Sequence, residues 1–284
     1  MATKYDLSAA VLLSALLIFG LVYFLFNKNA KSEVIISDRM SEFIDAIDQS
    51  MVAKSHQLIV FDLDDTVFRS SSILGTPTWY YHTINILRQN GAPSQDAFYV
   101  VNDIDKVIQE NVKVMVVEQS TITAIKRWQS LGATIVGVSS RPSYFQEVTE
   151  KHLKQIGLAF NAPVFQCVEQ QWSYARSVFK GGVIYAGKKI SKDQAFIKFH
   201  DLAVGCGLSV ELIGQADDQQ RYISKVSQYA QDSRINYLGI IYGGALSRTE
   251  FNVVEAGQKL LELETRLKRV IVPQAYRSVL MGAR

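Results

Sequence analysis

The sequence predicts an α/β fold of three layers, in which helices cover both faces of a central, mostly parallel β-sheet. Two apolar runs, residues 58–61 and 133–138, each end in polar side chains. A short apolar run of this kind is typical of a buried strand, and strands buried on both faces are typical of parallel sheets. Residues 121–129 between the two runs have helical character. Strands therefore alternate with helices, as in a sheet built from strand–helix–strand units.

The first element that we expect is a membrane-spanning helix over residues 7–26, within an anchor of residues 1–30. This segment has no charged side chain. At about 1.5 Å per helical residue it would span roughly 30 Å, the thickness of a bilayer core. A cleavable signal peptide is the alternative, but its apolar region would cover only about 7–15 residues and would end at small side chains. Lys28 stands where such a site needs a small residue.

Residues 31–55 are predicted to form a linker helix between this anchor and the following domain. Met40, Phe43, Ile44 and Ile47 recur at the spacing of one helical face. The rest of the stretch is largely polar, as expected of an amphipathic helix.

A group of carboxylates directly follows the first predicted strand. Asp62 and Asp64 lie two residues apart, so in an extended segment their side chains project the same way, whereas Asp65 points to the other face. Two ionised carboxylates so close repel each other, which either raises the pKa of one toward acid/base chemistry or recruits a cation. An Asp-rich turn after a strand is the alternative interpretation.

Two later segments carry further charged residues at the predicted ends of elements. Ser191 is a good N-cap for a helix, which places Lys192 in the first turn. A lysine at a helix N-terminus is electrostatically unfavourable unless it faces an anion. Residues 209–214, which include the apolar pair Leu212 and Ile213, lead to Asp217 and Asp218.

Taken in order, these segments resemble the four motifs of the haloacid dehalogenase-like phosphohydrolase superfamily, of the Asp-x-Asp-x-Thr phosphatase type. The resemblance spans about residues 55–245 and implies a Rossmann-like catalytic domain, which we place at residues 56–272. It also implies that Asp62 is the nucleophile that attacks phosphorus and that Asp64 is the general acid/base. The dehalogenases proper lack the second aspartate, which this chain has.

The resemblance further implies a set of residues that bind the phosphoryl group. The second motif of the family ends its strand in a hydroxyl residue, for which Ser139 is the first choice and Ser140 the second. Arg141 could add a charge-assisted contact to the substrate, or could be an ordinary loop side chain at the surface. Lys192 matches the lysine of the third motif.

A Mg²⁺ site completes what the resemblance implies. Its ligands would be a side-chain oxygen of Asp62, the backbone carbonyl of Asp64, and Asp217 as first choice with Asp218 as second. Such hard oxygen ligands suit Mg²⁺. The fourth motif departs from the family pattern, because residues 214–216 stand between the apolar residues and the carboxylates.

Residues 68–118, between the first and second motifs, are too long for a loop and must fold. In the superfamily an insertion here is a cap over the active site, so we expect a small, mostly helical cap. Residues 102–105 imitate the catalytic Asp-x-Asp but are expected to cap a helix. The aromatic residues Trp79–Tyr81 are expected to pack the cap, with stacking on a substrate ring as the alternative. Metal-ligand spacing is absent from the histidines, which are His56, His82, His152 and His200.

The remaining chain supplies a hairpin, a strand and a closing helix. Gly181 and Gly182 predict a turn between residues 177–179 and 183–185. Residues 238–244 look like a fifth strand, and residues 251–269 have the apolar spacing of a helix. We treat residues 273–284 as a C-terminal tail.

Composition excludes some classes of function and leaves others open. The net charge is +3 with 20% charged residues and no basic run, which argues against a nucleic-acid partner. Only Cys167 and Cys206 are present. They are too few for a disulfide framework and lack metal-ligand spacing, but a single disulfide between them is possible.

The expected function is a Mg²⁺-dependent phosphomonoester hydrolase that acts on a phosphorylated small molecule of unspecified identity. A catalytically silent, membrane-tethered interaction module is the alternative. Positive charges after residue 26 favour a cytoplasmic domain. N-terminal anchors also export large domains, and export is common among phosphatases with the related Asp-x-Asp-Asp-Thr signature. We therefore expect a single-pass anchor with a periplasm-facing domain, and a cytoplasmic one as the alternative.

Overall fold

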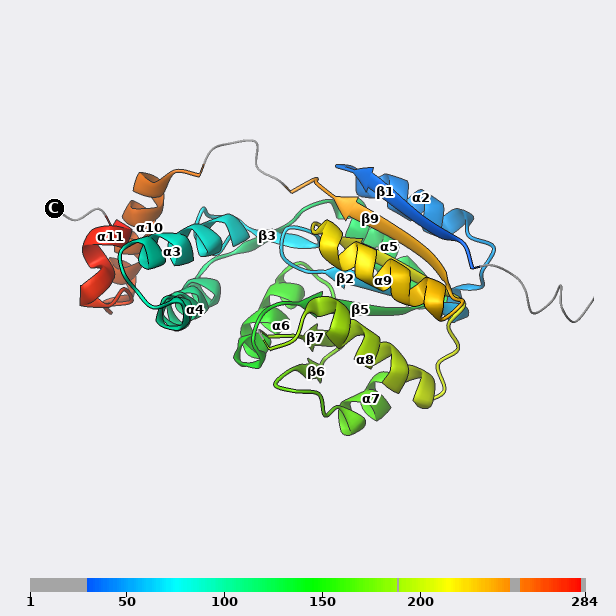
Figure 1. The fold of residues 1–284 in the computed structure, drawn as a ribbon. Helices are drawn as coiled ribbons and strands as arrows, with labels where there is room; N and C mark the ends of the chain where they lie inside the picture. Colours follow the sequence, from blue (N-terminus) through cyan, green and yellow to red (C-terminus); the bar gives the residue numbers. More distant parts are fainter. Residues whose placement is uncertain (1–29, 188, 246–250, 282–284) are drawn as a thin grey trace, which may run out of the picture.

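The central feature of the molecule is a seven-stranded sheet with the strand order β1-β9-β8-β2-β5-β7-β6 (Figure 1). The computed structural model describes residues 30–187, 189–245 and 251–281. Every neighbouring pair in the sheet is parallel except β6 and β7, which form an antiparallel hairpin at one edge. The prediction of an α/β fold with a mostly parallel sheet is therefore confirmed. The strands are β1 (Ser32–Ser37), β2 (Gln57–Asp62), β5 (Thr134–Ser139), β6 (Val178–Lys180), β7 (Val183–Tyr185), β8 (Leu212–Asp217) and β9 (Asn236–Tyr242).

Helices cover both faces of this sheet. Helices α2 (Met40–Gln49) and α5 (Gln119–Ser130) contact each other on one face, whereas α8 (Lys192–Gly205) and α9 (Gln220–Asp232) contact each other on the opposite face (Figure 1). The remaining helices lie in the connections between strands. The short η1 (Lys54–His56) precedes β2, and the connection from β5 to β6 contains η2 (Ser143–Phe145), α6 (Gln146–Gln155) and α7 (Phe165–Gln171).

The main core lies on both sides of β2, in which every residue is buried. On the α2/α5 side, Phe61 packs edge-on against Phe43 at 6.1 Å and lies stacked against Trp128 at 6.5 Å between ring centroids. Burying each such side chain contributes roughly 1.5–3 kcal/mol to folding. The indole N–H of Trp128 donates to Asp48 over 2.7 Å, so the ring is buried without an unpaired donor. This packing fixes the strand that ends at Asp62.

The segment 31–55 differs from the single linker helix that we predicted. Residues Ser32–Ser37 form the edge strand β1, which runs parallel to β9 with Ser32 opposite Tyr237. Only after it does α2 begin, with Met40, Phe43 and Ile47 buried at the helical spacing that the sequence showed. A strand of six residues with three exposed positions leaves too short a pattern to separate from the helix that follows it.

The insert, residues 68–118, is mostly helical. It leaves and rejoins the main domain through an antiparallel ribbon of β3 (Phe68–Ser70) and β4 (Val114–Val116), and it carries α3 (Pro77–Gln89) and α4 (Ser94–Asn111). Thr76 caps α3 by accepting from the Trp79 N–H over 3.1 Å, and Pro77 occupies the first turn. Our prediction that residues 102–105 cap a helix is wrong, because α4 begins at Ser94 and these residues lie in its interior.

The end of the described chain packs against the insert and not against the sheet. Helix α10 (Val253–Leu267), η3 (Gln274–Tyr276) and α11 (Arg277–Met281) lie beside α3 and α4 (Figure 1). Together they share a second apolar core that includes Trp79, Leu87, Leu260 and Leu280. Residues 273–281, which we treated as part of a tail, therefore belong to a folded unit with the insert.

No helix within residues 30–187, 189–245 and 251–281 is long and apolar enough to cross a bilayer. The membrane span predicted at residues 7–26 lies outside the described residues. Cys167 of α7 and Cys206 at the end of α8 form a disulfide, as the sequence allowed.

Candidate active site

Three strands end side by side at one edge of the sheet, and each ends in a polar residue. Asp62 closes β2, Ser139 closes the neighbouring strand β5, and Asp217 closes β8 on the other side. Phe61 is opposite Ala216 in the β2–β8 register, which places Asp62 level with Asp217. Ligands of open α/β sheets bind at such carboxyl ends. The sheet topology thus brings together three residues that are far apart in the sequence.

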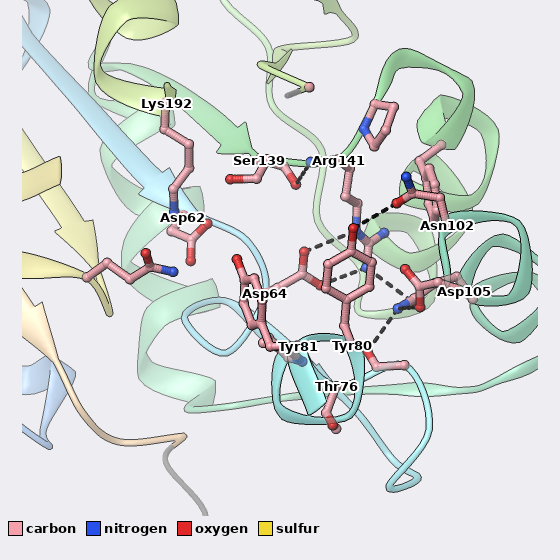
Figure 2. A pocket seen from close by; sticks show the side chains of 18 of the residues that line it. Asp62, Asp64, Thr76, Tyr80, Tyr81, Asn102, Asp105, Ser139, Arg141 and Lys192 are labelled. Carbon is pink, nitrogen blue, oxygen red and sulfur yellow. Dashed lines mark hydrogen bonds and ion pairs between the residues drawn. The ribbon is translucent and has the colours of Figure 1, made fainter. Parts of the chain in front are cut away.

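Lys192 joins two of these strand ends. Its ammonium Nζ lies 2.8 Å from Asp62 Oδ1 (Figure 2). It also lies 2.8 Å from Asp217 Oδ2, and all three side chains are almost completely buried. The lysine stands in the first turn of α8, as predicted, where the Gln194 side chain accepts from the Ser191 N–H. The Nζ also lies 4.6 Å from the ring centroid of Tyr222. Two further lysines lie a few residues upstream of Lys192. Lys189 is exposed, and Lys188 lies outside the described residues.

Asp218 adds a third carboxylate to this centre. One oxygen each of Asp62, Asp217 and Asp218 lies within 4.8 Å of the other two. Burial raises the pKa of Asp62 to about 7, although Lys192 acts against this, and burial likewise raises the pKa of Asp217 and of Asp218 to about 6. Burial alone would lower the pKa of Lys192, but Asp62 and Asp217 outweigh it and raise that pKa above its ordinary value. When ionised, three carboxylates beside one ammonium leave excess negative charge, which a cation would neutralise.

Residues 214–216, which stand before the two carboxylates, do not interrupt the strand. Residues 214–216 are part of β8, which continues without a break to Asp217. Gln215 is buried in that strand and accepts a hydrogen bond from the Tyr237 hydroxyl over 2.8 Å. Gly214 faces Ile47, and a Cβ atom there would lie 2.8 Å from the Ile47 Cδ1. The presence of Gln215 and Gly214 in this buried strand is therefore explained by the side chains that they contact.

Arg141 holds Asp64 from the opposite side of the site. Its Nε donates to Asp64 Oδ2 over 3.0 Å and its Nη2 to Asp64 Oδ1 over 2.7 Å. Its Nη1 donates to Thr149 Oγ1 over 3.0 Å, and its Nη2 also donates to Gln109 Oε1 over 3.1 Å. The guanidinium therefore orients Asp64. The substrate contact that we expected of Arg141 stays a prediction.

The hydroxyl residues of the second motif lie at the same edge. Ser139 is buried, and its Oγ accepts from the Arg141 N–H over 3.1 Å. Ser140 is exposed, and both serines line the cavity described below. Thr66 of the first motif donates to Asp62 Oδ2 over 3.3 Å and is fully buried.

A cavity of about 390 Å³ opens above these residues, between the sheet edge and the insert. Asp62, Asp64, Ser139 and Lys192 lie on the sheet side (Figure 2). Asp218, which directly follows β8, also lines the cavity. The insert contributes Thr76, Tyr80, Tyr81, Asn102, Asp105 and Gln109.

Thr76, Asn102, Asp105 and Gln109 were not predicted as site residues from the sequence. A signal was available, because Asn102, Asp105 and Gln109 follow the helical spacing of an inner face yet are polar and buried. The aromatic residues 79–81 divide between the two interpretations. Trp79 packs the insert, as expected, whereas Tyr80 and Tyr81 line the cavity. His152 lies outside the cavity wall, where its Nε2 lies 2.9 Å from the Gln109 carbonyl oxygen.

The fold and the acidic strand ends define an α/β protein with a candidate active site between its sheet and a helical insert. The chain belongs to a family described as proteins of unknown function (DUF2608), whose model matches residues 37–263. It is 25% identical over 187 residues to a protein of Chlamydia muridarum named "Putative outer membrane protein", an overlap of 65% of this chain and 68% of that one. A protein of the same name from Chlamydia trachomatis is 23% identical over 184 residues, with the same shares covered.

Proposed function

We propose that the protein is a Mg²⁺-dependent phosphomonoester hydrolase that works through an aspartyl-phosphate on Asp62. The observation that carries this proposal is the buried bridge of Lys192 between Asp62 and Asp217, at the floor of a cavity. A structural ion pair would need only one carboxylate, whereas two carboxylates around one lysine at a strand end suit a charged ligand. The resemblance of the four ordered segments to haloacid dehalogenase-like phosphatases supports the same reaction.

The proposed reaction uses the two aspartates of the first motif in different roles. An oxygen of Asp62 attacks phosphorus, the bond from phosphorus to the ester oxygen breaks, and Asp64 gives a proton to the departing alcohol. A water molecule then attacks the aspartyl-phosphate and gives its proton to Asp64, which releases inorganic phosphate and restores Asp62. Lys192 offsets the repulsion between the anionic nucleophile and the phosphoryl oxygens, and Ser139 lies at the neighbouring strand end to bind one of them.

The residues present fit a magnesium ion. The donor set of Asp62, Asp217 and Asp218 is composed of carboxylate oxygens alone, which is the ligand chemistry of hard divalent cations. When bound, Mg²⁺ would supply charge neutralisation and orientation of the phosphoryl group. The Asp64 side chain is not in this cluster, because Arg141 holds it.

We further propose that the protein works outside the cytoplasm, tethered to a membrane through residues 7–26. The disulfide between Cys167 and Cys206 supports an oxidising compartment. The names of the chlamydial relatives, which refer to the outer membrane, point the same way. The phosphorylated substrate would be a small molecule, since the cavity volume falls within the usual range for small ligands.

The direct test is hydrolysis of p-nitrophenyl phosphate by the full chain in detergent, with and without Mg²⁺. We expect turnover that needs Mg²⁺ and that Asp62→Asn lowers by about three orders of magnitude or more. Asp45→Asn, the same change at an exposed site on α2, should leave the rate unchanged. Absence of turnover over a broad panel of phosphate esters would contradict the proposal. Binding of phosphate without turnover would instead favour the silent interaction module.

A further inference from the structure

The insert sends one side chain toward the reaction centre itself. Tyr81 lies in the second turn of α3 and lines the cavity together with Asp62, Lys192 and Asp218. Figure 2 shows its ring extending from the insert toward Asp62. Its neighbour Trp79 instead points into the apolar core of the insert, where it is 1% exposed. Helix α3 thus anchors itself with one aromatic residue and directs another across the cavity.

The Tyr81 ring has a supported position and a phenol that faces the cavity. It packs edge-on against the Tyr80 ring with 5.4 Å between centroids, and 49% of the residue is exposed. Within the described part of the chain, its hydroxyl has no hydrogen-bond partner. Lys192 and Asp218 are among the charged groups that act on it, although the largest effect on its pKa is burial, which raises it. The phenol therefore stays protonated at neutral pH and can donate a hydrogen bond.

The side chains at the strand ends surround Asp62 on the sheet side only. The side of Asp62 that faces the insert is left open to the cavity. Lys192 and Ser139 lie along the sheet edge, and Asp217 and Asp218 lie at the end of β8. A phosphoryl group at Asp62 would present its remaining oxygens to the cavity, where Tyr81 extends. Resting on the proposed function, we propose that the Tyr81 hydroxyl donates a hydrogen bond to a phosphoryl oxygen, so that the insert contributes a catalytic residue.

Tyr81→Phe tests this because it keeps the ring and removes only the hydroxyl. We expect kcat/KM for p-nitrophenyl phosphate to fall about tenfold, and the inhibition constant of inorganic phosphate to rise about tenfold, as for loss of a hydrogen bond to a charged group. Tyr144→Phe is the matched control, since Tyr144 is 47% exposed and is not among the residues that line the cavity. It should leave both quantities unchanged.

The outcomes separate this inference from the proposed function. If the wild-type protein turns over the ester and loses that activity in Asp62→Asn, while Tyr81→Phe matches the wild type, the role of Tyr81 is refuted and the hydrolase stands. Equal losses in Tyr81→Phe and Tyr144→Phe would also refute it, because a change outside the cavity would then have the same effect. A wild-type protein without any Mg²⁺-dependent turnover would overturn both proposals. Thermal unfolding of each variant checks that the ring replacement leaves the fold intact.

Discussion

Arg141 donates a hydrogen bond to each carboxylate oxygen of Asp64, with donor–acceptor distances of 3.0 and 2.7 Å, and both residues line the cavity. The guanidinium lies 5.5 and 5.9 Å from the ring centroids of Phe68 and Phe145. It also bonds to Gln109, which donates in turn to the Gly75 carbonyl over 2.8 Å. The orientation of Asp64 is therefore linked to the position of the insert.

Arg141→Lys should lower kcat about tenfold, because a lysine retains the charge but cannot hold both oxygens of Asp64 in one plane. Steady-state kinetics with p-nitrophenyl phosphate measure this. If Asp64 activates water in the second step, the phosphorylated enzyme should also accumulate, which acid quenching and intact-protein mass spectrometry detect. Arg127→Lys is the control, since Arg127 is likewise paired with an aspartate, Asp48, but on the surface. An unchanged kcat in Arg141→Lys would exclude this orienting role.

Lys192→Met should destabilise the fold by about 3–5 kcal/mol, because it leaves the buried carboxylates of Asp62 and Asp217 without their cation. The free energy of unfolding from urea titration gives the value. Mg²⁺ should recover part of the loss in the variant, since it replaces the missing positive charge. The exposed Lys189 provides the control as Lys189→Met, for which no change is expected. A Lys192→Met protein as stable as the wild type would contradict the buried bridge.

His152 makes stability depend on pH in a defined direction. It is fully buried, and burial lowers its pKa to about 4 from the ordinary 6.5. The contribution of neutral His152 to the free energy of unfolding is complete above about pH 6.5. It is lost as the pH falls toward 4, because the histidine of the unfolded chain binds a proton first. The total loss is about 3 kcal/mol. Asp62, Asp65 and Asp218, whose pKa values are raised, have the opposite effect. Their contribution to the free energy of unfolding is lost as the pH rises.

The comparison with His152→Gln isolates this effect, because the aspartates are the same in both proteins. Glutamine can still donate to the Gln109 carbonyl, which His152 Nε2 contacts at 2.9 Å. The difference in unfolding free energy between wild type and variant should be constant above pH 7 and should shift in favour of the variant between pH 6.5 and 4. Parallel curves over that range would show that His152 does not retain its neutral form.

Removal of the disulfide should destabilise the protein by about 4 kcal/mol on the loop-entropy model, since Cys167 and Cys206 are separated by 39 positions. Urea unfolding of the double variant Cys167→Ser, Cys206→Ser tests this against the oxidised wild type. Reducing agent should lower the stability of the wild type to a similar extent and leave the double variant unaffected. A reductant effect in the double variant would assign the change to something other than this bond.

The strands around the site could be predicted because each is an apolar run that ends in a charged or hydroxyl residue. Asp62 and Ser139 were placed at strand ends for this reason, whereas Lys192 was placed in the first turn of a helix because Ser191 is a good N-cap. The partner of Arg141 could not be predicted, since its pairing with Asp64 depends on two strands lying adjacent in space. Strand β1 was missed because its exposed Val34 and Ile36 do not produce the pattern of a buried strand.

The insert was the part least accessible to sequence reasoning. Its length showed that it folds, and the prediction of helices was correct. The sequence could not decide whether Tyr81 packs the insert or faces the cavity, because which face of a helix meets the sheet depends on the tilt of the whole insert. The packing of α10 and α11 against the insert depends on contacts between residues more than a hundred positions apart. Apolar spacing shows which face of such a helix is buried, but not which element covers that face.

The second apolar core, shared by the insert and the last helices, has a consequence for biosynthesis. Helices α3 and α4 leave the ribosome early, but Leu260, Leu263, Val272 and Leu280, which cover their apolar side, are made much later. Until then the apolar side of α3 and α4 would be exposed to solvent, whereas the strands of the sheet could already pair with one another. The cavity would be enclosed only after these residues are made, so a chain that stops before residue 253 would carry the acidic centre without its enclosure.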